Sequence, residues 1–157
     1  MPENIAHRFV SDVMTARFIA CSPYMSLAEA HELLKKNRIR RLPVVDQDNR
    51  VLGIITQRDI FAARPAETAH ARTPEELVHV LSSVTVGVVM SKKPFTAYQT
   101  DSVGRAAEIM LDRKIGGLPV IDVNDKLVGV LTESDIFRAI ARRWREDNLK
   151  LSGAHRP

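Results

Sequence analysis

Apolar residues recur every three to four positions after residue 26, at Leu27, Ala30, Leu33 and Leu34. This spacing places them on one face of an α-helix. Ser26, followed three residues later by Glu29, forms a capping-box pattern, in which each side chain hydrogen-bonds the backbone N–H of the other at a helix start. The pattern therefore predicts an amphipathic helix that begins at Ser26.

Two short apolar runs follow this helix and enclose a polar turn. Residues 42–45 and 51–55 are mostly apolar, whereas residues 46–49 carry Asp and Asn, which tolerate the tight geometry of turns. Together these segments predict an antiparallel hairpin. A short strand near residues 18–21 and a second helix from about Gln57 complete a β-α-β-β-α unit.

The whole pattern occurs twice, with an offset of 76 residues. From Val10 to Phe61, about 16 of 52 positions are identical to their partners without a gap. The identities include structurally special residues, such as the pairs Met14 and Met90, Pro43 and Pro119, Gly53 and Gly129, and Asp59 and Asp135. A unit of this size buries too small a fraction of its surface to be stable alone, so we expect the two copies to share one core.

The repeat sets the expected domain organisation. The linker contains Thr73, Pro74 at the first helical position and Glu76, a pattern that predicts a short helix. Residues 63–72 are Ala, Pro and polar residues, which we expect to be mobile. The expected segments are an N-terminal extension (1–9), a first repeat (10–64), a linker with a short helix (65–85), a second repeat (86–142), and a helix end with a tail (143–157).

The motifs around the hairpins resemble those of a known family. The first copy reads Leu-Pro-Val-Val-Asp at 42–46 and Gly-Ile-Ile-Thr-Gln-Arg-Asp at 53–59, and the second reads Leu-Pro-Val-Ile-Asp at 118–122 and Gly-Val-Leu-Thr-Glu-Ser-Asp at 129–135. Val-Met-Thr at 13–15 and Val-Met-Ser at 89–91 fit as well. Twice and in register, these motifs resemble a tandem pair of CBS (cystathionine-β-synthase) domains, or Bateman module. The layout is similar to that of stand-alone bacterial acetoin-utilisation-type CBS proteins.

This resemblance implies both a fold and a function. The implied fold is α+β, with two CBS repeats, each β-α-β-β-α, packed pseudo-symmetrically through their sheets. Members of the family bind adenosine-containing ligands in clefts between the repeats: AMP, ADP or ATP, and sometimes NAD or S-adenosylmethionine. They regulate enzymes, transporters and channels, and their modules form disc-like homodimers. No catalytic domain accompanies the repeats here, so we expect the regulated protein to be another, unknown chain.

Each copy carries a Thr-x-x-Asp pattern where its second helix begins, at Thr56 and Asp59 and at Thr132 and Asp135. An Asp carboxylate accepts hydrogen bonds from both vicinal hydroxyls of a ribose, and a Thr hydroxyl binds ribose or phosphate oxygen. The free N–H groups of a helix start also favour an anion. The same pattern is a helix N-cap with an acid at the third position. Both roles are compatible, because a capped helix start lies where a ligand cleft would open.

By resemblance, the adenine base lies against the first strand and the segment before Leu-Pro of each copy. The two expected sets are Ile19, Ala20, Arg40 and Arg41 in the first copy, and Phe95, Thr96, Gly116 and Gly117 in the second. The two glycines leave room for a purine and let the backbone approach it. We therefore expect two unequal sites, of which the second is better suited to adenosine.

The arginines of the first copy admit three interpretations. Arg40 and Arg41 clamp phosphate groups with their forked donors, fill the first cleft, or belong to a solvated basic surface with the neighbouring cations. Those neighbours are Lys35, Lys36 and Arg38. Arg58 is placed to reach a phosphate, and Ser134 holds its position in the second copy.

Composition narrows the class of protein. The chain has 157 residues and a mass of 17.6 kDa, with 45% hydrophobic and 27% charged residues, as in ordinary globular domains. Its single cysteine, Cys21, cannot form an internal disulfide, which fits a reducing compartment. No apolar run approaches the ~18 residues of a membrane span, and the first ten residues lack a signal-peptide core. We therefore expect a cytoplasmic protein without membrane contact.

Motifs for catalysis and for metal binding are missing from the sequence. The five histidines show no metal-ligand spacing, and there is no P-loop, dinucleotide-binding or nucleophile-elbow motif. Cys21 lies on an expected buried strand and is interpreted as a core residue. We therefore expect no enzymatic activity, no catalytic residue, no metal site and no required cofactor.

The charge of the chain is concentrated partly in the last helix. The net charge is +4, but aromatic residues make up only 5%, too few for a row of base-stacking platforms. The last helix, expected over about 133–147, has an apolar face and basic flanks, which predict either a core or dimer helix with a solvated side or a nucleic-acid contact. The apolar face contains Phe137, Ile140, Ala141 and Trp144, and the flanks contain Arg138, Arg142, Arg143 and Arg145.

Three hypotheses for function follow. The leading one is a ligand-sensing regulatory module that binds an adenine nucleotide and modulates a partner protein or its own oligomer. The alternative is an interaction or dimerisation scaffold without a small ligand. The third is nucleic-acid binding through the basic last helix, which we consider unlikely.

Overall fold

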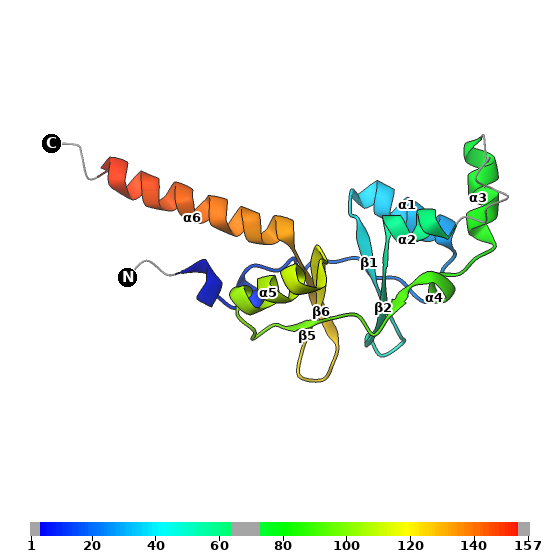
Figure 1. Ribbon diagram of the computed structural model, residues 1–157, viewed down its shortest axis with the longest axis horizontal. Helices are drawn as coiled ribbons and strands as arrows, with labels where there is room; N and C mark the ends of the chain where they lie inside the picture. The colour runs from blue at the N-terminus through cyan, green and yellow to red at the C-terminus, as the bar shows by residue number, and fades with distance from the viewer. Residues whose placement is uncertain (1–3, 64–72, 154–157) are drawn as a thin grey trace. The chain divides into compact units, whose positions relative to one another are not determined.

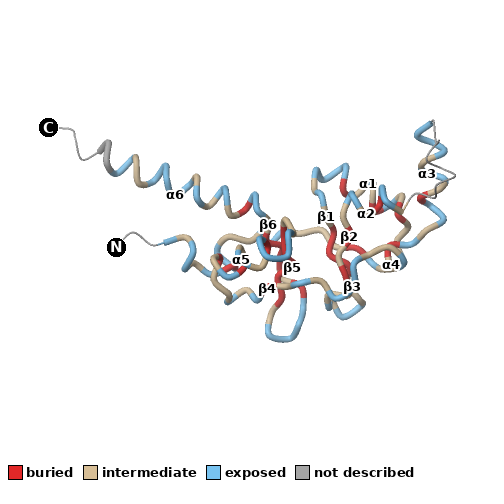
Figure 2. The backbone as a smooth tube through the Cα atoms, in the orientation of Figure 1, coloured by how far each residue is buried: buried red, intermediate tan, exposed pale blue. Residues whose placement is uncertain are grey.

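The computed structural model describes residues 4–63 and 73–153, with side chains up to residue 150. Within these ranges the chain forms two compact units (Figure 1). The repeat-1 unit comprises Ile19–Pro94 and Asp125–Leu127. The repeat-2 unit comprises the chain up to Phe18, Phe95–Asn124 and the chain from Val128 onward. Buried residues of each unit form their own hydrophobic cluster, in place of the one shared core expected from the small size of a single repeat. Many of these residues lie on the central strands (Figure 2).

The repeat-1 unit places helices against a three-stranded sheet. The sheet has the order β1-β2-β3, and its neighbouring strands run antiparallel. Apolar residues of α1 and of the hairpin are fully buried together, which explains why the periodic pattern predicted these elements. The elements are α1 (Leu27–Asn37), β1 (Arg41–Val45), β2 (Val51–Thr56), α2 (Gln57–Ala62), α3 (Pro74–Ser82), α4 (Val86–Val89) and β3 (Ser91–Lys92).

The repeat-2 unit repeats this plan with a different opening and a longer final helix. Its sheet has the order β4-β5-β6, and β4 runs parallel to β5. The core gathers residues of α5, β5 and β6 with Val10 from the N-terminal segment. The elements are η1 (Ile5–His7), η2 (Val10–Asp12), β4 (Ala97–Tyr98), α5 (Val103–Arg113), β5 (Gly117–Ile121), β6 (Leu127–Thr132) and α6 (Glu133–Gly153).

Helix starts follow the capping patterns of the sequence. The Ser26 hydroxyl accepts a hydrogen bond from the Glu29 N–H at 3.2 Å, and the Glu29 carboxylate accepts one from the Ser26 N–H at 2.9 Å. The hydrogen bonds that the Glu29 carboxylate accepts from the Ser26 N–H and from the Ser26 hydroxyl hold the pKa of Glu29 below its ordinary value. At α3, the Thr73 hydroxyl accepts from the Glu76 N–H, and Pro74 is the first helical residue. Both predicted helix starts are confirmed.

The first residues of each repeat, 10–18 and 86–94, pack on the hairpin of the other repeat. The Thr15 N–H donates to the Val130 carbonyl on β6 at 2.9 Å, and Ser91 pairs with Ile54 on β2. The two repeats of the sequence were expected at residues 10–64 and 86–142. The boundaries of the two compact units therefore differ from those of the repeats. Residues up to Phe18 lie in the repeat-2 unit, and residues 86–94 lie in the repeat-1 unit.

Two equivalent glycines make room for this packing. A Cβ atom at Gly129 would lie 2.5 Å from the Met14 sulfur. A Cβ atom at Gly53 would lie 2.5 Å from the Met90 sulfur and also 2.9 Å from the Ser91 carbonyl oxygen. A methionine side chain can shift, whereas the carbonyl oxygen belongs to the paired backbone of β3. The two glycines are therefore not equally replaceable.

We expect Gly53→Ala to destabilise the chain by about 1–3 kcal/mol, the typical cost of overpacking a core. Gly129→Ala should cost less, because only a flexible side chain must move. Urea unfolding of the two variants measures the difference. Equal losses of stability would contradict the role assigned to the Ser91 carbonyl.

Two elements differ from their predicted extent. The strand expected near residues 18–21 is reduced to a single parallel bridge between Cys21 and Val44, since only Cys21 reaches the β1 backbone. Helix α6 continues to Gly153, beyond the predicted end near residue 147, because no Gly or Pro interrupts it earlier. Residues 64–72 of the segment expected to be mobile lie outside the described residues.

Candidate functional site

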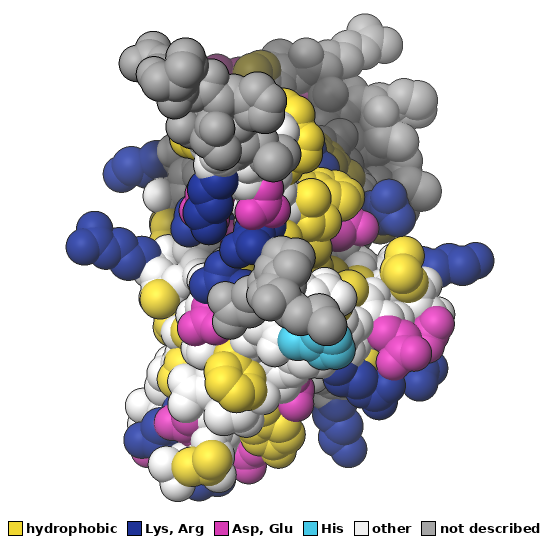
Figure 3. Space-filling model, turned by 90° about the vertical axis from the view of Figure 1, so that its left-hand side faces the viewer, with side chains coloured by type: hydrophobic (Ala, Val, Ile, Leu, Met, Phe, Trp, Pro, Cys, Tyr) yellow, Lys and Arg dark blue, Asp and Glu magenta, His cyan; other side chains and the backbone are white. Residues whose placement is uncertain are grey.

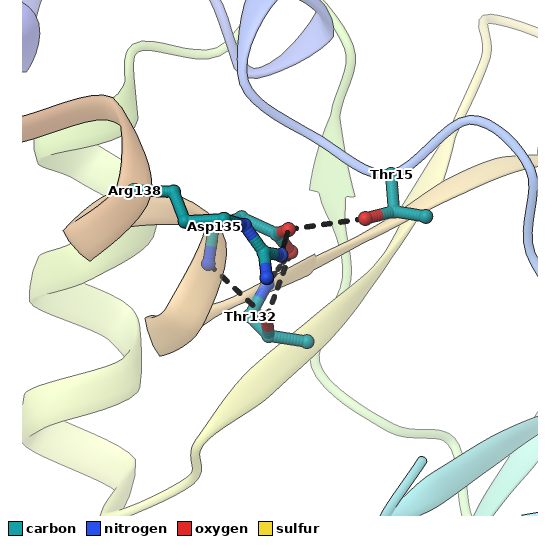
Figure 4. A network of polar contacts seen from close by, with 4 residues as sticks. All are labelled: Thr15, Thr132, Asp135 and Arg138. Atoms are coloured by element: carbon teal, nitrogen blue, oxygen red, sulfur yellow. Dashed lines mark hydrogen bonds and ion pairs between the residues drawn. The ribbon is translucent and has the colours of Figure 1, made fainter. Parts of the chain in front are cut away.

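The repeat-2 unit carries a compact polar network at the start of α6 (Figure 4). One oxygen of the Asp135 carboxylate, Oδ2, accepts hydrogen bonds from the backbone N–H and the hydroxyl of Thr132, both at 2.8 Å. The Asp135 N–H donates back to the Thr132 hydroxyl at 3.4 Å. Thr132 and Asp135 therefore form the N-cap that the sequence pattern allowed.

The second carboxylate oxygen of Asp135, Oδ1, is also occupied. It accepts from the Thr15 hydroxyl at 3.0 Å and from the Arg138 guanidinium. The Asp135 side chain is only 4% exposed, whereas that of Arg138 is 66% exposed. A buried carboxylate needs such compensation, because burial without partners is costly. The four groups thus satisfy Asp135 without a ligand.

Sequence reasoning missed Thr15 and Arg138 as members of this network. Thr15 belongs to the quoted Val-Met-Thr motif, but the network joins positions 120 residues apart, and no local pattern indicates that contact. Arg138 lies one helical turn after Asp135, the i,i+3 spacing at which opposite charges meet on a helix. This i,i+3 spacing was the one sequence signal that could have indicated the ion pair between Asp135 and Arg138.

The repeat-1 unit carries the same cap with an open outer oxygen. Asp59 Oδ2 accepts from the N–H and the hydroxyl of Thr56, at 2.8 and 2.7 Å, and the Asp59 N–H donates to the Thr56 hydroxyl at 3.2 Å. In the part of the chain that the structure describes, Asp59 Oδ1 accepts no hydrogen bond. The positions equivalent to Thr15 and Arg138 are Ser91 and Ala62. Ala62 has no group that can pair with the carboxylate.

The segment before Leu-Pro is held against each helix start. The Gln57 N–H donates to the Arg40 carbonyl at 3.1 Å, and the Glu133 N–H donates to the Gly116 carbonyl at 3.3 Å. Arg41 is the register partner of Thr56 in the hairpin. These contacts bring Arg40, Arg41 and Gly116, with the adjacent Gly117, next to the Thr-x-x-Asp motifs.

The other residues expected at the two sites lie in the same compact unit as the Thr-x-x-Asp motif of their site, but no hydrogen bond described above joins them to that motif. Ile19 and Ala20 are half-buried, and Ile19 packs against the repeat-1 core. Phe95 is 47% exposed, and the Arg113 guanidinium lies 4.5 Å from its ring centroid in a cation–π contact. Thr96 is half-buried. Arg58 and Ser134, the second residues after each cap threonine, are both exposed.

Cys21 is placed as a structural residue. Its side chain is buried in the repeat-1 core, and burial raises the pKa of the thiol to about 11. The thiolate is the reactive form of cysteine, so a thiol with this pKa stays protonated at neutral pH. This position agrees with the expected core role.

Two further kinds of feature are absent from the described residues. No group of three or more His, Cys, Asp or Glu side chains is arranged to hold a metal ion. No described helix is long and apolar enough to cross a membrane.

The apolar face of α6 is exposed rather than buried in its unit. Phe137 and Trp144 are 66% and 67% exposed, and Ile140 is 49% exposed. Of the apolar residues in this part of α6, Ile136 packs against the repeat-2 core. Within the described residues α6 is therefore not a core helix beyond its first turns. On the face drawn in Figure 3, Lys and Arg side chains are interspersed with apolar and acidic ones rather than gathered in one basic patch.

Comparisons with known proteins match both repeats. The family model of the CBS domain matches residues 10–66 and 86–142. Among solved structures, a putative acetoin utilization protein (AcuB) from Vibrio cholerae is 29% identical with a TM-score of 0.69, covering 96% of this chain and 98% of that one. CBSX2 of Arabidopsis thaliana, solved in complex with AMP, is 28% identical with a TM-score of 0.71, covering 85% and 96%.

A third structure adds a different ligand. The CBS domain pair of protein MJ0100, in complex with 5′-methylthioadenosine and S-adenosyl-L-methionine, is 28% identical with a TM-score of 0.69 and covers 87% of this chain and 98% of that one. The chain spans about half the length of several of the curated relatives that it matches. The predicted resemblance and the tandem CBS-pair fold are confirmed by these matches.

Proposed function

Since the chain belongs to the CBS-domain family and carries two of its repeats, we propose that it is a regulatory module that binds adenosine-containing ligands at the two Thr-x-x-Asp sites. The observation that carries this proposal is the pair of capped helix starts, each with an aspartate beside the segment before Leu-Pro. Related CBS pairs solved with AMP or with 5′-methylthioadenosine and S-adenosylmethionine support the ligand class.

The chemistry of the proposed sites rests on the outer carboxylate oxygens. In each cap, the threonine occupies Oδ2 of the aspartate, and Oδ1 is the proposed acceptor for ribose hydroxyls. In the repeat-1 unit this oxygen is open. In the repeat-2 unit a ribose must compete with Thr15 and Arg138.

The two sites therefore have opposite advantages: the repeat-2 site is better suited to the adenine base, and the repeat-1 site is better suited to the ribose. Gly116 and Gly117 leave space for a purine in the repeat-2 unit, whereas Arg40 and Arg41 crowd or charge the repeat-1 site. The ribose acceptor, by contrast, is preorganised only at Asp59. We propose that the two sites bind adenosine ligands with unequal affinity, because the space for the base and the availability of the ribose acceptor differ between them.

A panel of AMP, ADP, ATP, NAD and S-adenosylmethionine in a thermal unfolding assay tests the ligand class. A ligand present at 100 times its dissociation constant is expected to add about 2.7 kcal/mol of stability. For a chain of this length, that corresponds to a rise in melting temperature of several degrees. No shift with any of the five, on protein shown to be free of ligand, would contradict the proposed function.

The competition at Asp135 gives a prediction of its own. In an Asp59→Ala background, Arg138→Ala is expected to tighten adenosine binding at the repeat-2 site by up to about fivefold, because an exposed ion pair of about 0.2–1 kcal/mol no longer has to be broken. Calorimetric titration with adenosine measures this change. Arg142→Ala, one turn further along α6, serves as the control and should leave the affinity unchanged. A weaker affinity in Arg138→Ala would show that the guanidinium contacts the ligand instead.

A second function, protein contact through α6, is favoured by one observation. Phe137, Ile140 and Trp144 are exposed, and exposed apolar patches of this kind mark interaction surfaces. We propose that this face contributes to self-association or to contact with the regulated partner. A solution mass of twice the chain mass in light scattering would support the homodimer.

A further inference from the structure

A basic cavity lies on the repeat-1 unit, between the C-terminal half of α1 and the start of α2. It has a volume of about 460 Å³. Three cations, Lys35, Arg38 and Arg40, line it together with His31 and Gln57, and no acidic residue is part of the lining. Cavities of roughly 300–1,000 Å³ are typical of small-molecule sites.

None of the three cations is neutralised within the part of the chain that the structure describes. Lys35, Arg38 and Arg40 take part in no ion pair and no side-chain hydrogen bond there. Like charges that converge on one concave surface repel each other and raise the local positive potential. An anion bound in the cavity would relieve this repulsion. Cations spread over an open surface repel each other less and would not be stabilised by an anion to the same extent.

The second repeat shows that the fold does not require these cations. At the offset of 76 residues, His31, Lys35 and Arg40 correspond to Ala107, Leu111 and Gly116, and Gln57 corresponds to Glu133. Only Arg38 keeps a cation, as Lys114. Helix α5 nevertheless has the same length as α1 and ends in the same left-handed conformation. The basic lining is therefore a property of one repeat, not of the helix or its cap.

His31 adds a ring nitrogen that has no polar partner among the described residues. Its Nδ1 atom is buried and has no hydrogen-bond partner in the described chain. The ring is instead positioned by an edge-on contact with Phe61, with the centroids 5.5 Å apart. Buried polar atoms without partners are uncommon in folded proteins, and they need a physical explanation. A ligand that reorients the imidazole would provide a partner.

The lining of the cavity does not include the proposed ribose acceptor of the same unit. Thr56 and Asp59 are not part of its lining, although Gln57 follows Thr56 directly. Because the cations form a concave cluster rather than a stripe along the surface, the geometry favours a compact ligand over a nucleic-acid backbone. We infer that this cavity is an anion site, and that it takes the phosphate groups of a small molecule, with Lys35, Arg38 and Arg40 as the binding cations.

Calorimetric titration of the full chain with inorganic pyrophosphate tests this inference. We expect the double variant Lys35→Gln/Arg38→Gln to weaken pyrophosphate binding by at least about tenfold, because it removes two charge-assisted hydrogen-bond donors. The matched control is Lys36→Gln/Lys114→Gln, which removes the same net charge. Lys36 lies on the same helix but outside the cavity, and Lys114 is the counterpart of Arg38 in the other repeat. The control should bind pyrophosphate nearly as the wild type does.

Two further readouts decide where the anion binds. Backbone amide NMR shifts on adding pyrophosphate are expected to concentrate at residues 31–40, and Asp59→Asn should leave binding intact or slightly tighter. Equal weakening in both double variants would show only a general effect of charge and would overturn the inference. Loss of binding in Asp59→Asn, or no binding by the wild type at millimolar pyrophosphate, would overturn it as well. None of these outcomes depends on whether the chain binds adenosine.

Discussion

Replacing Asp135 with alanine is expected to lower the free energy of unfolding by about 2–4 kcal/mol. The variant removes the return hydrogen bonds of the α6 cap, which are worth about 1 kcal/mol in typical helices. It also removes the charged acceptor of the Thr15 hydroxyl and leaves the partly buried Thr132 N–H without its partner, and hydrogen bonds to charged groups are worth about 1.5–3 kcal/mol. Urea unfolding of the ligand-free chain measures the loss.

Asp59→Ala is the internal control for this prediction. It removes the equivalent cap of α2, but Asp59 is half-buried and its outer oxygen accepts no hydrogen bond in the described chain. We expect a loss of about 1–2 kcal/mol, in the range of a lost helix cap. A loss as large as that of Asp135→Ala would mean that Thr15 and Arg138 contribute nothing measurable to Asp135.

The same Asp59→Ala variant is expected to have its larger effect on ligand binding. Removing the open acceptor should weaken AMP binding at the repeat-1 site by roughly ten- to a hundredfold, because two ribose hydroxyls lose a charged acceptor. Equilibrium binding of AMP, followed for the higher- and lower-affinity sites, measures the change. Asp48→Ala, which removes an exposed carboxylate from the turn of the same unit, is the matched control and should bind AMP as the wild type does. Unchanged AMP binding in Asp59→Ala would remove Asp59 from the site.

Local patterns made the elements and the caps predictable from the sequence. Ser26 with Glu29 and Thr73 with Glu76 fix helix starts through contacts three residues apart, so the sequence alone contains all that these contacts need. The Thr-x-x-Asp caps are local in the same sense. The alternation of apolar runs and a polar turn predicted the hairpins for the same reason.

Contacts between distant segments were not predictable in this way. The exchange of opening segments pairs Thr15 with Val130, and nothing in either neighbourhood specifies that pairing. The occupancy of the Asp135 outer oxygen depends on this exchange, so the difference between the two aspartates emerges only from the structure. The side chain of Arg40 was likewise left between three interpretations, and the structure places it in the lining of a cavity with Lys35 and Arg38.

We propose that the chain binds adenosine ligands at two unequal sites, one at each Thr-x-x-Asp cap. Calorimetric titration of ligand-free wild type and of the double variant Asp59→Ala/Asp135→Ala with AMP tests it most directly. We predict two binding events of different affinity in the wild type and none in the double variant at the same concentrations. AMP binding by the double variant with wild-type affinity, or the absence of binding heat in the wild type, would contradict the claim.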